Sequence, residues 1–142
     1  MTTWDGGCYR PRKKRILKAR HCVCCDVQLP DYRQRKRKYY CDRCAKYVLV
    51  IQQRAMREVA AAVRRGELLH VREHICLECN IWTAVHYEHR HYSKPLEVTP
   101  LCQGCNNKRG PALDVRELVA KLRVERPELA LPDKPSLNHS DI

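Results

Sequence analysis

Paired cysteines carry the strongest chemical signal in the chain. Eight of its ten cysteines form four Cys-x-x-Cys pairs, a spacing that lets a tight turn present both thiolates to one tetrahedral ion. Joining neighbouring pairs predicts two structural zinc sites with four thiolates each. The predicted ligands are Cys22, Cys25, Cys41 and Cys44 in the first site and Cys76, Cys79, Cys102 and Cys105 in the second.

Two alternatives to this assignment stay open: another cysteine could be a zinc ligand, or the cysteines could form disulfides in place of metal sites. Cys8 and Cys24 are left over, and Cys24 is close enough in sequence to replace a neighbour as a ligand of the first site. Redox dithiols or a disulfide framework would use the same cysteines without metal. The N-terminal segment lacks the apolar stretch of a secretion signal, and no run approaches the roughly 18 apolar residues of a membrane span. We therefore expect a cytoplasmic protein without a membrane partner, a setting that favours zinc over disulfides.

A carboxylate, an imidazole and an amide accompany the second group of cysteines. Glu88 and His89 are adjacent, and in an extended backbone they point to opposite sides. Asn106 directly follows the last cysteine and is predicted to begin a helix that carries its amide oxygen back across the site. Such an oxygen-rich, incompletely filled site suits Mg²⁺ or Mn²⁺, with water and phosphate completing the shell. A neutral histidine beside it is suited to act as a general base near neutral pH.

The stretch 76–111 resembles the HNH endonucleases, or ββα-metal nucleases, in the small phage-type version with a four-cysteine zinc site. The matching residues are Cys76-x-x-Cys79, Glu88-His89, Pro95-Leu96-Glu97-Val98, Leu101-Cys102-x-x-Cys105-Asn106 and Lys108-Arg109-Gly110. Each piece alone is weak, and the combined pattern is specific. The resemblance implies a treble-clef or ββα-metal domain within a small, zinc-stabilised α+β chain.

The resemblance also assigns roles by position. Glu88 would be a ligand of the catalytic metal, His89 the general base and Asn106 a second ligand, with Asn107 as the alternative if the register shifts by one. Glu97 stands where the family commonly has an Asn that braces the loop holding the base. The implied reaction is hydrolysis of DNA phosphodiester bonds, with Mg²⁺ or Mn²⁺ stabilising the leaving 3′ oxygen and with purely structural zinc. Phage packaging or recombination proteins are implied partners, and the host cytoplasm is the implied location of a phage-encoded chain.

Positive charge is concentrated in the first half of the chain. Residues 1–66 carry 18 Lys plus Arg against 5 acids, a net charge of +13, whereas residues 67–142 carry 10 against 11. Two basic blocks lie in this half, over residues 10–20 and 33–38. Like charges so close together repel one another unless a polyanion is bound, which favours nucleic acid as the partner, and we expect double-stranded DNA. Nearby Tyr32, Tyr39 and Tyr40 could stack on bases, and a solubilising charged tail is the alternative. The residues predicted to contact nucleic acid are Arg12, Lys13, Lys14, Arg15, Arg35, Lys36, Arg37, Lys38, Arg90, Lys108 and Arg109.

Small elements must position these groups, because 142 residues without a single Phe supply little core. Apolar residues recur at helical spacing from Val48 to Ala62, and Gly66 supplies a stop. Asp114 and Glu117 have the spacing of a capping box for a final helix. A strand is predicted over 96–99. The predicted order is a basic disordered arm (1–20), a zinc knuckle (21–44), a linking helix (45–66), a nuclease domain with a C-terminal helix (67–126) and a Pro-containing tail (127–142).

Two other classes of protein fit parts of this pattern. A non-catalytic zinc-finger protein that binds DNA or RNA would account for the charge asymmetry and for both cysteine sites. A transcription or assembly factor that uses zinc modules for protein contacts would account for the second site but not for the basic blocks. The combination of Glu88, His89 and Asn106 favours the nuclease, because a binding protein has no need to gather these three groups.

Overall fold

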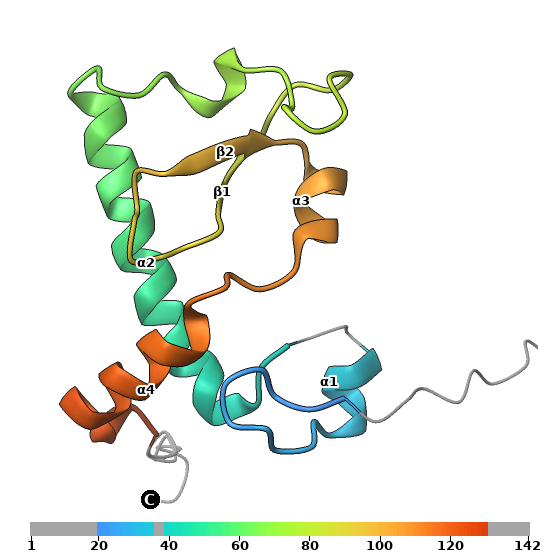
Figure 1. The fold of residues 1–142 in the computed structure, drawn as a ribbon, viewed down its shortest axis with the longest axis vertical. Coiled ribbons are helices and arrows are strands. Elements are labelled where there is room, and N and C mark those ends of the chain that lie inside the picture. Colours follow the sequence, from blue (N-terminus) through green and yellow to red (C-terminus); the bar gives the residue numbers. More distant parts are fainter. Residues whose placement is uncertain (1–19, 36–38, 131–142) are drawn as a thin grey trace, which may run out of the picture.

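The computed structural model describes residues 20–35 and 39–130 (Figure 1). The predicted basic arm up to residue 19 and the tail from residue 131 lie outside this range. Within it the chain is a small α+β protein with a two-stranded sheet and several helices. No helix in the described part of the chain is both long and apolar enough to cross a membrane.

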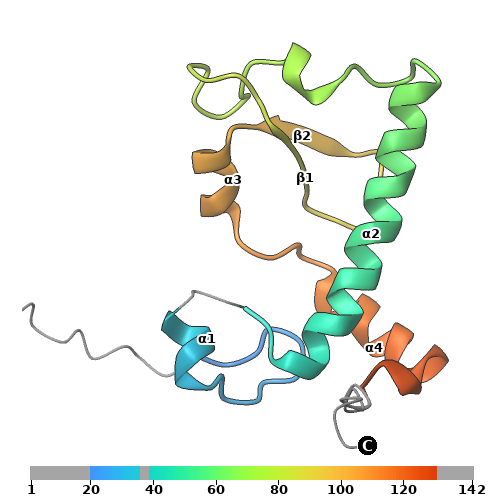
Figure 2. The ribbon, with the colours of Figure 1, turned by 180° about the vertical axis from the view of Figure 1, so that it is seen from behind.

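One helix, α2 (Asp42–Arg64), runs along the long axis of the molecule (Figures 1 and 2). It begins three residues before the predicted start, because Cys41 serves as its N-cap and accepts a hydrogen bond from the Cys44 backbone N–H. Cys44 therefore lies in the first turn of α2. Its apolar stripe, which includes Val48 and Ala62, is buried, and Gly66 with φ +76° follows its C-terminus.

The sheet is an antiparallel hairpin of β1 (His86–His89) and β2 (Val98–Leu101). The observed β2 begins two residues after the predicted strand over 96–99. In the hairpin register Glu88 is opposite Thr99 and His89 is opposite Val98. Adjacent residues of a strand face opposite sides, so Glu88 and His89 diverge as predicted from an extended backbone.

Helix α3 (Gln103–Arg109) follows β2 directly. The prediction that Asn106 begins this helix is wrong, because Cys102 takes the extended N-cap conformation and the helix starts at Gln103. Cys105 is therefore inside α3 and Asn106 lies one turn in. Gly110, with φ +71°, ends the helix in a backbone conformation that favours glycine.

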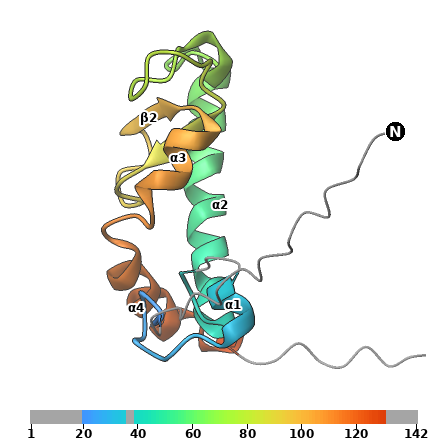
Figure 3. The same cartoon turned by 90° about the vertical axis from the view of Figure 1, so that its right-hand side faces the viewer.

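Helix α4 (Val115–Glu125) packs against the first part of α2, and the short helix α1 (Asp31–Arg35) lies within the segment 21–44 for which a zinc knuckle is predicted. The 3₁₀ turns η1 (Val71–Glu73) and η2 (Pro127–Ala130) complete the described elements. The hairpin and α3 lie to one side of α2 (Figure 3). As Figures 1 and 2 show, α1 and α4 gather at one end of α2 and the loop before β1 lies at the other.

The predicted capping box of the final helix does not form. Asp114 is the N-cap residue of α4, but its side chain makes no cap hydrogen bond. Its two carboxylate oxygens instead accept the backbone N–H groups of Tyr92 and Ser93, each at 2.9 Å. Distant donors in the loop after β1 thus replace the local ones that the spacing of Asp114 and Glu117 suggests.

Candidate metal centres and candidate active site

The first cysteine cluster brings together the four predicted thiols. The sulfurs of Cys22, Cys25, Cys41 and Cys44 all lie within 4.8 Å of one another. A tetrahedron with zinc–sulfur bonds of about 2.3 Å has edges of about 3.8 Å. The Cys25 and Cys41 sulfurs are 3.7 Å apart, which fits such an edge. Cys24 is outside the cluster, so the structure favours Cys25 over Cys24 as the ligand.

Helix α4 closes one side of this first cluster. The Nη2 of Arg123 donates to the Cys44 sulfur at 3.0 Å, and its guanidinium lies 5.6 Å from the ring centroid of Tyr47. An ion pair joins Arg116 of α4 to Asp26, with Nη1 of the arginine 3.1 Å from Oδ1 of the aspartate. A tetrathiolate zinc site carries net negative charge, so a guanidinium beside one sulfur suits it.

The second cluster connects the Cys-x-x-Cys turn before β1 to the end of the hairpin and to α3. Its sulfurs also lie within 4.8 Å of one another, and those of Cys79 and Cys102 are 3.9 Å apart. The knuckle turn is closed by the Asn80 N–H, which donates to the Cys76 carbonyl at 2.9 Å. Both clusters confirm the prediction of two four-cysteine sites, and their donors and spacing fit two zinc ions. The members of the second cluster are Cys76, Cys79, Cys102 and Cys105.

Glu88 is a buried carboxylate with one satisfied oxygen. Its residue surface is 7 % exposed, and its Oε1 accepts a hydrogen bond from the Arg90 Nε at 2.6 Å. Its Oε2 is buried and has no hydrogen-bond partner in the described part of the protein. A buried carboxylate oxygen without a partner is costly, and it is a natural place for a cation.

The guanidinium of Arg90 donates hydrogen bonds to other groups of the protein. Besides its ion pair with Glu88, its Nη2 donates to the carbonyls of Gly110 at 3.3 Å and Pro111 at 3.1 Å. It therefore fastens the segment after α3 to the end of β1. The structure shows only these internal acceptors for Arg90 in the described part of the chain. The predicted contact of Arg90 with phosphate stays a prediction.

His89 is held in one orientation by a backbone carbonyl. The residue is 8 % exposed, and its Nε2 lies 3.0 Å from the Pro95 oxygen. A carbonyl only accepts, so Nε2 carries the hydrogen and Nδ1 of the neutral ring has a free lone pair. Burial lowers the pKa of His89 below its ordinary value, against opposing effects of the Pro95 carbonyl and of the Glu88 and Asp114 carboxylates.

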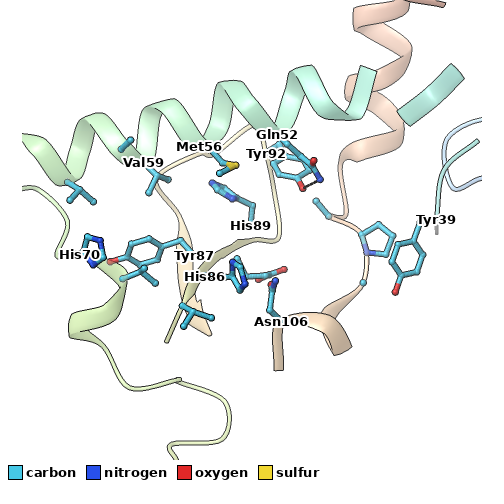
Figure 4. A pocket seen from close by; sticks show the side chains of 18 of the residues that line it. Tyr39, Gln52, Met56, Val59, His70, His86, Tyr87, His89, Tyr92 and Asn106 are labelled. Carbon is cyan, nitrogen blue, oxygen red and sulfur yellow. Dashed lines mark hydrogen bonds between the residues drawn. The ribbon is translucent and has the colours of Figure 1, made fainter. Parts of the chain in front are cut away.

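A cavity of about 850 Å³ joins the three predicted catalytic residues. Glu88 and His89 of β1 and Asn106 of α3 line it, and residues of α2 form one wall; we call it the α2 cavity. Figure 4 shows His89 beside Met56 and Tyr92 near α2, with His86 and Asn106 together farther from that helix. The exposed Asn107 does not line the cavity, so Asn106 is the better placed of the two alternatives.

Two further residues complete the surroundings: His86, which is absent from the predicted catalytic set, and Asp114, for which the sequence predicted only a capping role. His86 lies on the same face of β1 as Glu88, two residues before it, and its Nε2 is 2.6 Å from the Gln103 Oε1. Asp114 braces the loop after His89. The strand period could have pointed to His86, whereas nothing local in the sequence pairs Asp114 with residues 92 and 93.

Other predicted site residues are less engaged with this centre. Glu97, at the position of the bracing Asn, is exposed and lies 3.8 Å from Lys94 in an ion pair. Arg109 pairs with Glu78 at 3.0 Å, and Lys108 is exposed on α3. The predicted nucleic-acid contacts that lie outside the described residues are Arg12, Lys13, Lys14, Arg15, Lys36, Arg37 and Lys38, and the side chain of Arg35 is not described either.

Comparison of the chain with models of protein families, with curated proteins and with solved structures finds no match. The structure shows a small α+β protein with two four-cysteine clusters that are consistent with zinc sites.

Proposed function

We propose that the chain is an HNH-type endonuclease that hydrolyses DNA phosphodiester bonds with the help of a divalent ion. The observation that supports this proposal best is the shared α2 cavity, which a carboxylate, an imidazole and an amide from β1 and α3 line together. Zinc in the two cysteine clusters would be purely structural, because four thiolates leave no open position for substrate.

The donors near the cavity fit a hard cation. Glu88 offers a buried carboxylate oxygen without a partner, and Asn106 offers an amide oxygen on the same cavity. Oxygen donors in small number suit Mg²⁺ or Mn²⁺, which keep several waters. A divalent ion held there supplies charge stabilisation at the phosphate and at the leaving 3′ oxygen.

His89 supplies the general base in this proposal. Its Nε2–H bond to the Pro95 carbonyl fixes the ring and leaves Nδ1 to accept a proton from water that attacks phosphorus in line. The backbone hydrogen bonds that Asp114 accepts hold the loop that contains Pro95. The products would carry 5′-phosphate and 3′-hydroxyl ends.

A non-catalytic zinc-finger protein that binds DNA or RNA is the second candidate. The ion pair between Arg90 and Glu88 favours it, because Arg90 already neutralises the carboxylate without any metal. In this alternative Glu88 has a structural role, and the α2 cavity has no reactive group. Both candidates require the zinc sites and both expect salt-sensitive binding to nucleic acid.

Cleavage of supercoiled plasmid separates the two candidates. Zinc-loaded protein is incubated with Mg²⁺ or Mn²⁺ and, in parallel, with EDTA, and His89→Ala is compared with His91→Ala. His91 follows His89 by two residues, in the loop after β1, but does not line the α2 cavity, so it is a matched control. The nuclease predicts metal-dependent nicking that is lost in His89→Ala and kept in His91→Ala. Binding without cleavage of plasmid or of single-stranded DNA under every metal condition would favour the zinc-finger candidate.

A further inference from the structure

We propose that the nuclease acts on an unpaired strand, whose scissile nucleotide enters the α2 cavity between β1 and α2. The inference rests on the proposed function, because it asks how a phosphate can reach His89 and Glu88. It adds the class of substrate, which neither the cysteine clusters nor the basic blocks specify.

Access to the reactive groups is the first step of the argument. Glu88 and His89 are more than nine-tenths buried, at 7 % and 8 % exposed, and both line the α2 cavity. Figure 4 shows His89 on the side of α2, next to Met56 and Tyr92. A phosphate within reach of water bound to Nδ1 therefore has to lie inside the cavity.

The size of the cavity is the second step. A volume of about 850 Å³ is that of a site for a small molecule or a single nucleotide, for which about 300–1,000 Å³ is typical. Duplex DNA is stiff, with a persistence length of about 150 base pairs, and its phosphates are fixed along two paired strands. A cavity of this size suits a nucleotide of one strand released from pairing better than the full width of an intact duplex.

The chemistry of the lining is the third step. Tyr39, Tyr40, Tyr87 and Tyr92 contribute aromatic rings to the cavity, and Arg64 is the one Lys or Arg among its described lining residues. Sites that read a duplex backbone are rich in Lys and Arg, whereas sites for single strands combine stacking rings with nearby positive charge. Positive charge is near in sequence, because Tyr39 directly follows the basic block that ends in Lys38.

Substrate form is the direct test. One labelled oligonucleotide is offered to zinc-loaded protein with Mg²⁺ as a single strand, as a linear duplex and as a duplex with a central unpaired bubble. We expect cleavage of the single strand and of the bubble at least tenfold faster than of the duplex, with cuts confined to unpaired positions. Equal cleavage of the duplex would overturn this inference and leave the nuclease intact.

A pair of charge-matched variants tests the cavity itself. Met56 lines the α2 cavity and is 65 % exposed, whereas Leu49 is 54 % exposed on the same helix and does not line it. Met56→Glu places a negative charge where the strand would pass, and we expect it to weaken single-strand binding about tenfold, with Leu49→Glu close to the parent protein. Fluorescence anisotropy in the His89→Ala background measures this without cleavage.

The two assays distinguish the possible failures. Absence of any cleavage together with single-strand binding that Met56→Glu weakens would refute the nuclease and retain the cavity as a site for unpaired nucleic acid. Equal effects of Met56→Glu and Leu49→Glu on binding would refute the cavity as the strand site, whatever the cleavage result.

Discussion

The carboxylate of Asp114 accepts a hydrogen bond from the backbone N–H of Ser93 at 2.9 Å, although the two residues are 21 positions apart in the sequence. With the second bond from Tyr92, the N-terminus of α4 holds the loop that follows His89. Partial burial raises the pKa of Asp114, but the hydrogen bonds from Ser93 and Tyr92 outweigh it, and the pKa is lowered overall.

Replacement of this carboxylate should have a pH-dependent cost. A lowered folded-state pKa contributes stability that is present above the unfolded value and lost as pH falls through the folded value. We expect Asp114→Ala to lower the free energy of unfolding by about 1 kcal/mol at neutral pH, since solvent partly screens the group. The gap to the parent protein should narrow below about pH 4. Urea unfolding at several pH values measures it, and a gap that does not change with pH would contradict the assignment.

Glu117→Ala is the control for this experiment. Glu117 is exposed on α4 and pairs only with Lys121 among its described ion pairs, at 3.1 Å. Its removal should change stability by less than about 0.5 kcal/mol. Loss of zinc in acid affects all three proteins alike and cancels in the differences.

The first zinc site gives a sharp prediction on adjacent cysteines. Cys24 is outside the cluster and Cys25 is inside it, so Cys24→Ser should still bind two zinc ions per chain. Cys25→Ser should bind one tightly, because three thiolates are left at the first site. Elemental analysis of the purified proteins counts the ions, and one ion in Cys24→Ser would show that the cluster is wrongly assigned.

Arg123 is expected to tune the same site from α4. Its hydrogen bond to the Cys44 sulfur would be lost in Arg123→Ala, and loss of such an outer partner typically weakens metal affinity about 10–100-fold. Competition with a coloured chelator should show one of the two ions released more readily. Lys121→Ala, an exposed change on the same helix, should release both ions as the parent does. Weakening of both sites in Arg123→Ala would indicate general destabilisation instead.

If the chain binds nucleic acid, as proposed, Arg90 and Lys108 should differ in how they affect that binding. Arg90 is bonded to Glu88, Gly110 and Pro111, so Arg90→Ala should lower the melting temperature and leave the salt dependence of binding unchanged. Lys108 is exposed, and Lys108→Ala should reduce the slope of log affinity against log salt by about 1 if it contacts a phosphate. Binding titrations at several salt concentrations compare the two. A reduced slope in Arg90→Ala would show that Arg90 leaves its internal partners.

Local patterns in the sequence predict the parts of the fold that depend on local spacing. Cys-x-x-Cys pairs specify both clusters because a two-residue turn is enough to orient two thiols. The apolar period from Val48 to Ala62 predicts α2. The helix starts earlier than this period indicates because the Cys41 sulfur acts as an N-cap acceptor, a role that the apolar pattern does not reveal. Likewise, the predicted start of α3 is wrong because the N-cap position of Cys102 cannot be recognised from the sequence pattern.

Contacts between distant segments were beyond such patterns. Asp114 has backbone donors of its own helix at the right spacing, but its oxygens accept the backbone N–H groups of residues 92 and 93 instead. The α2 cavity needs a helix to lie beside a hairpin that begins more than 20 residues later, and no period encodes that distance. Glu88, His89 and Asn106 could be proposed as a set from the sequence, but their common cavity and the carbonyl partner of His89 could not.

The unbroken course of α2 sets the distance between the two ends of the protein, and so the length of nucleic acid that can contact both ends if the proposed function holds. With 23 residues, the helix is about 34 Å long, close to one turn of duplex DNA. Because the helix has no hinge, it works as a spacer between the first zinc knuckle and the opposite end of the protein. A fragment too short to bridge this span can occupy one module only and forgoes the gain in effective concentration that a longer polymer receives. Affinity should therefore rise steeply with fragment length once the span is reached.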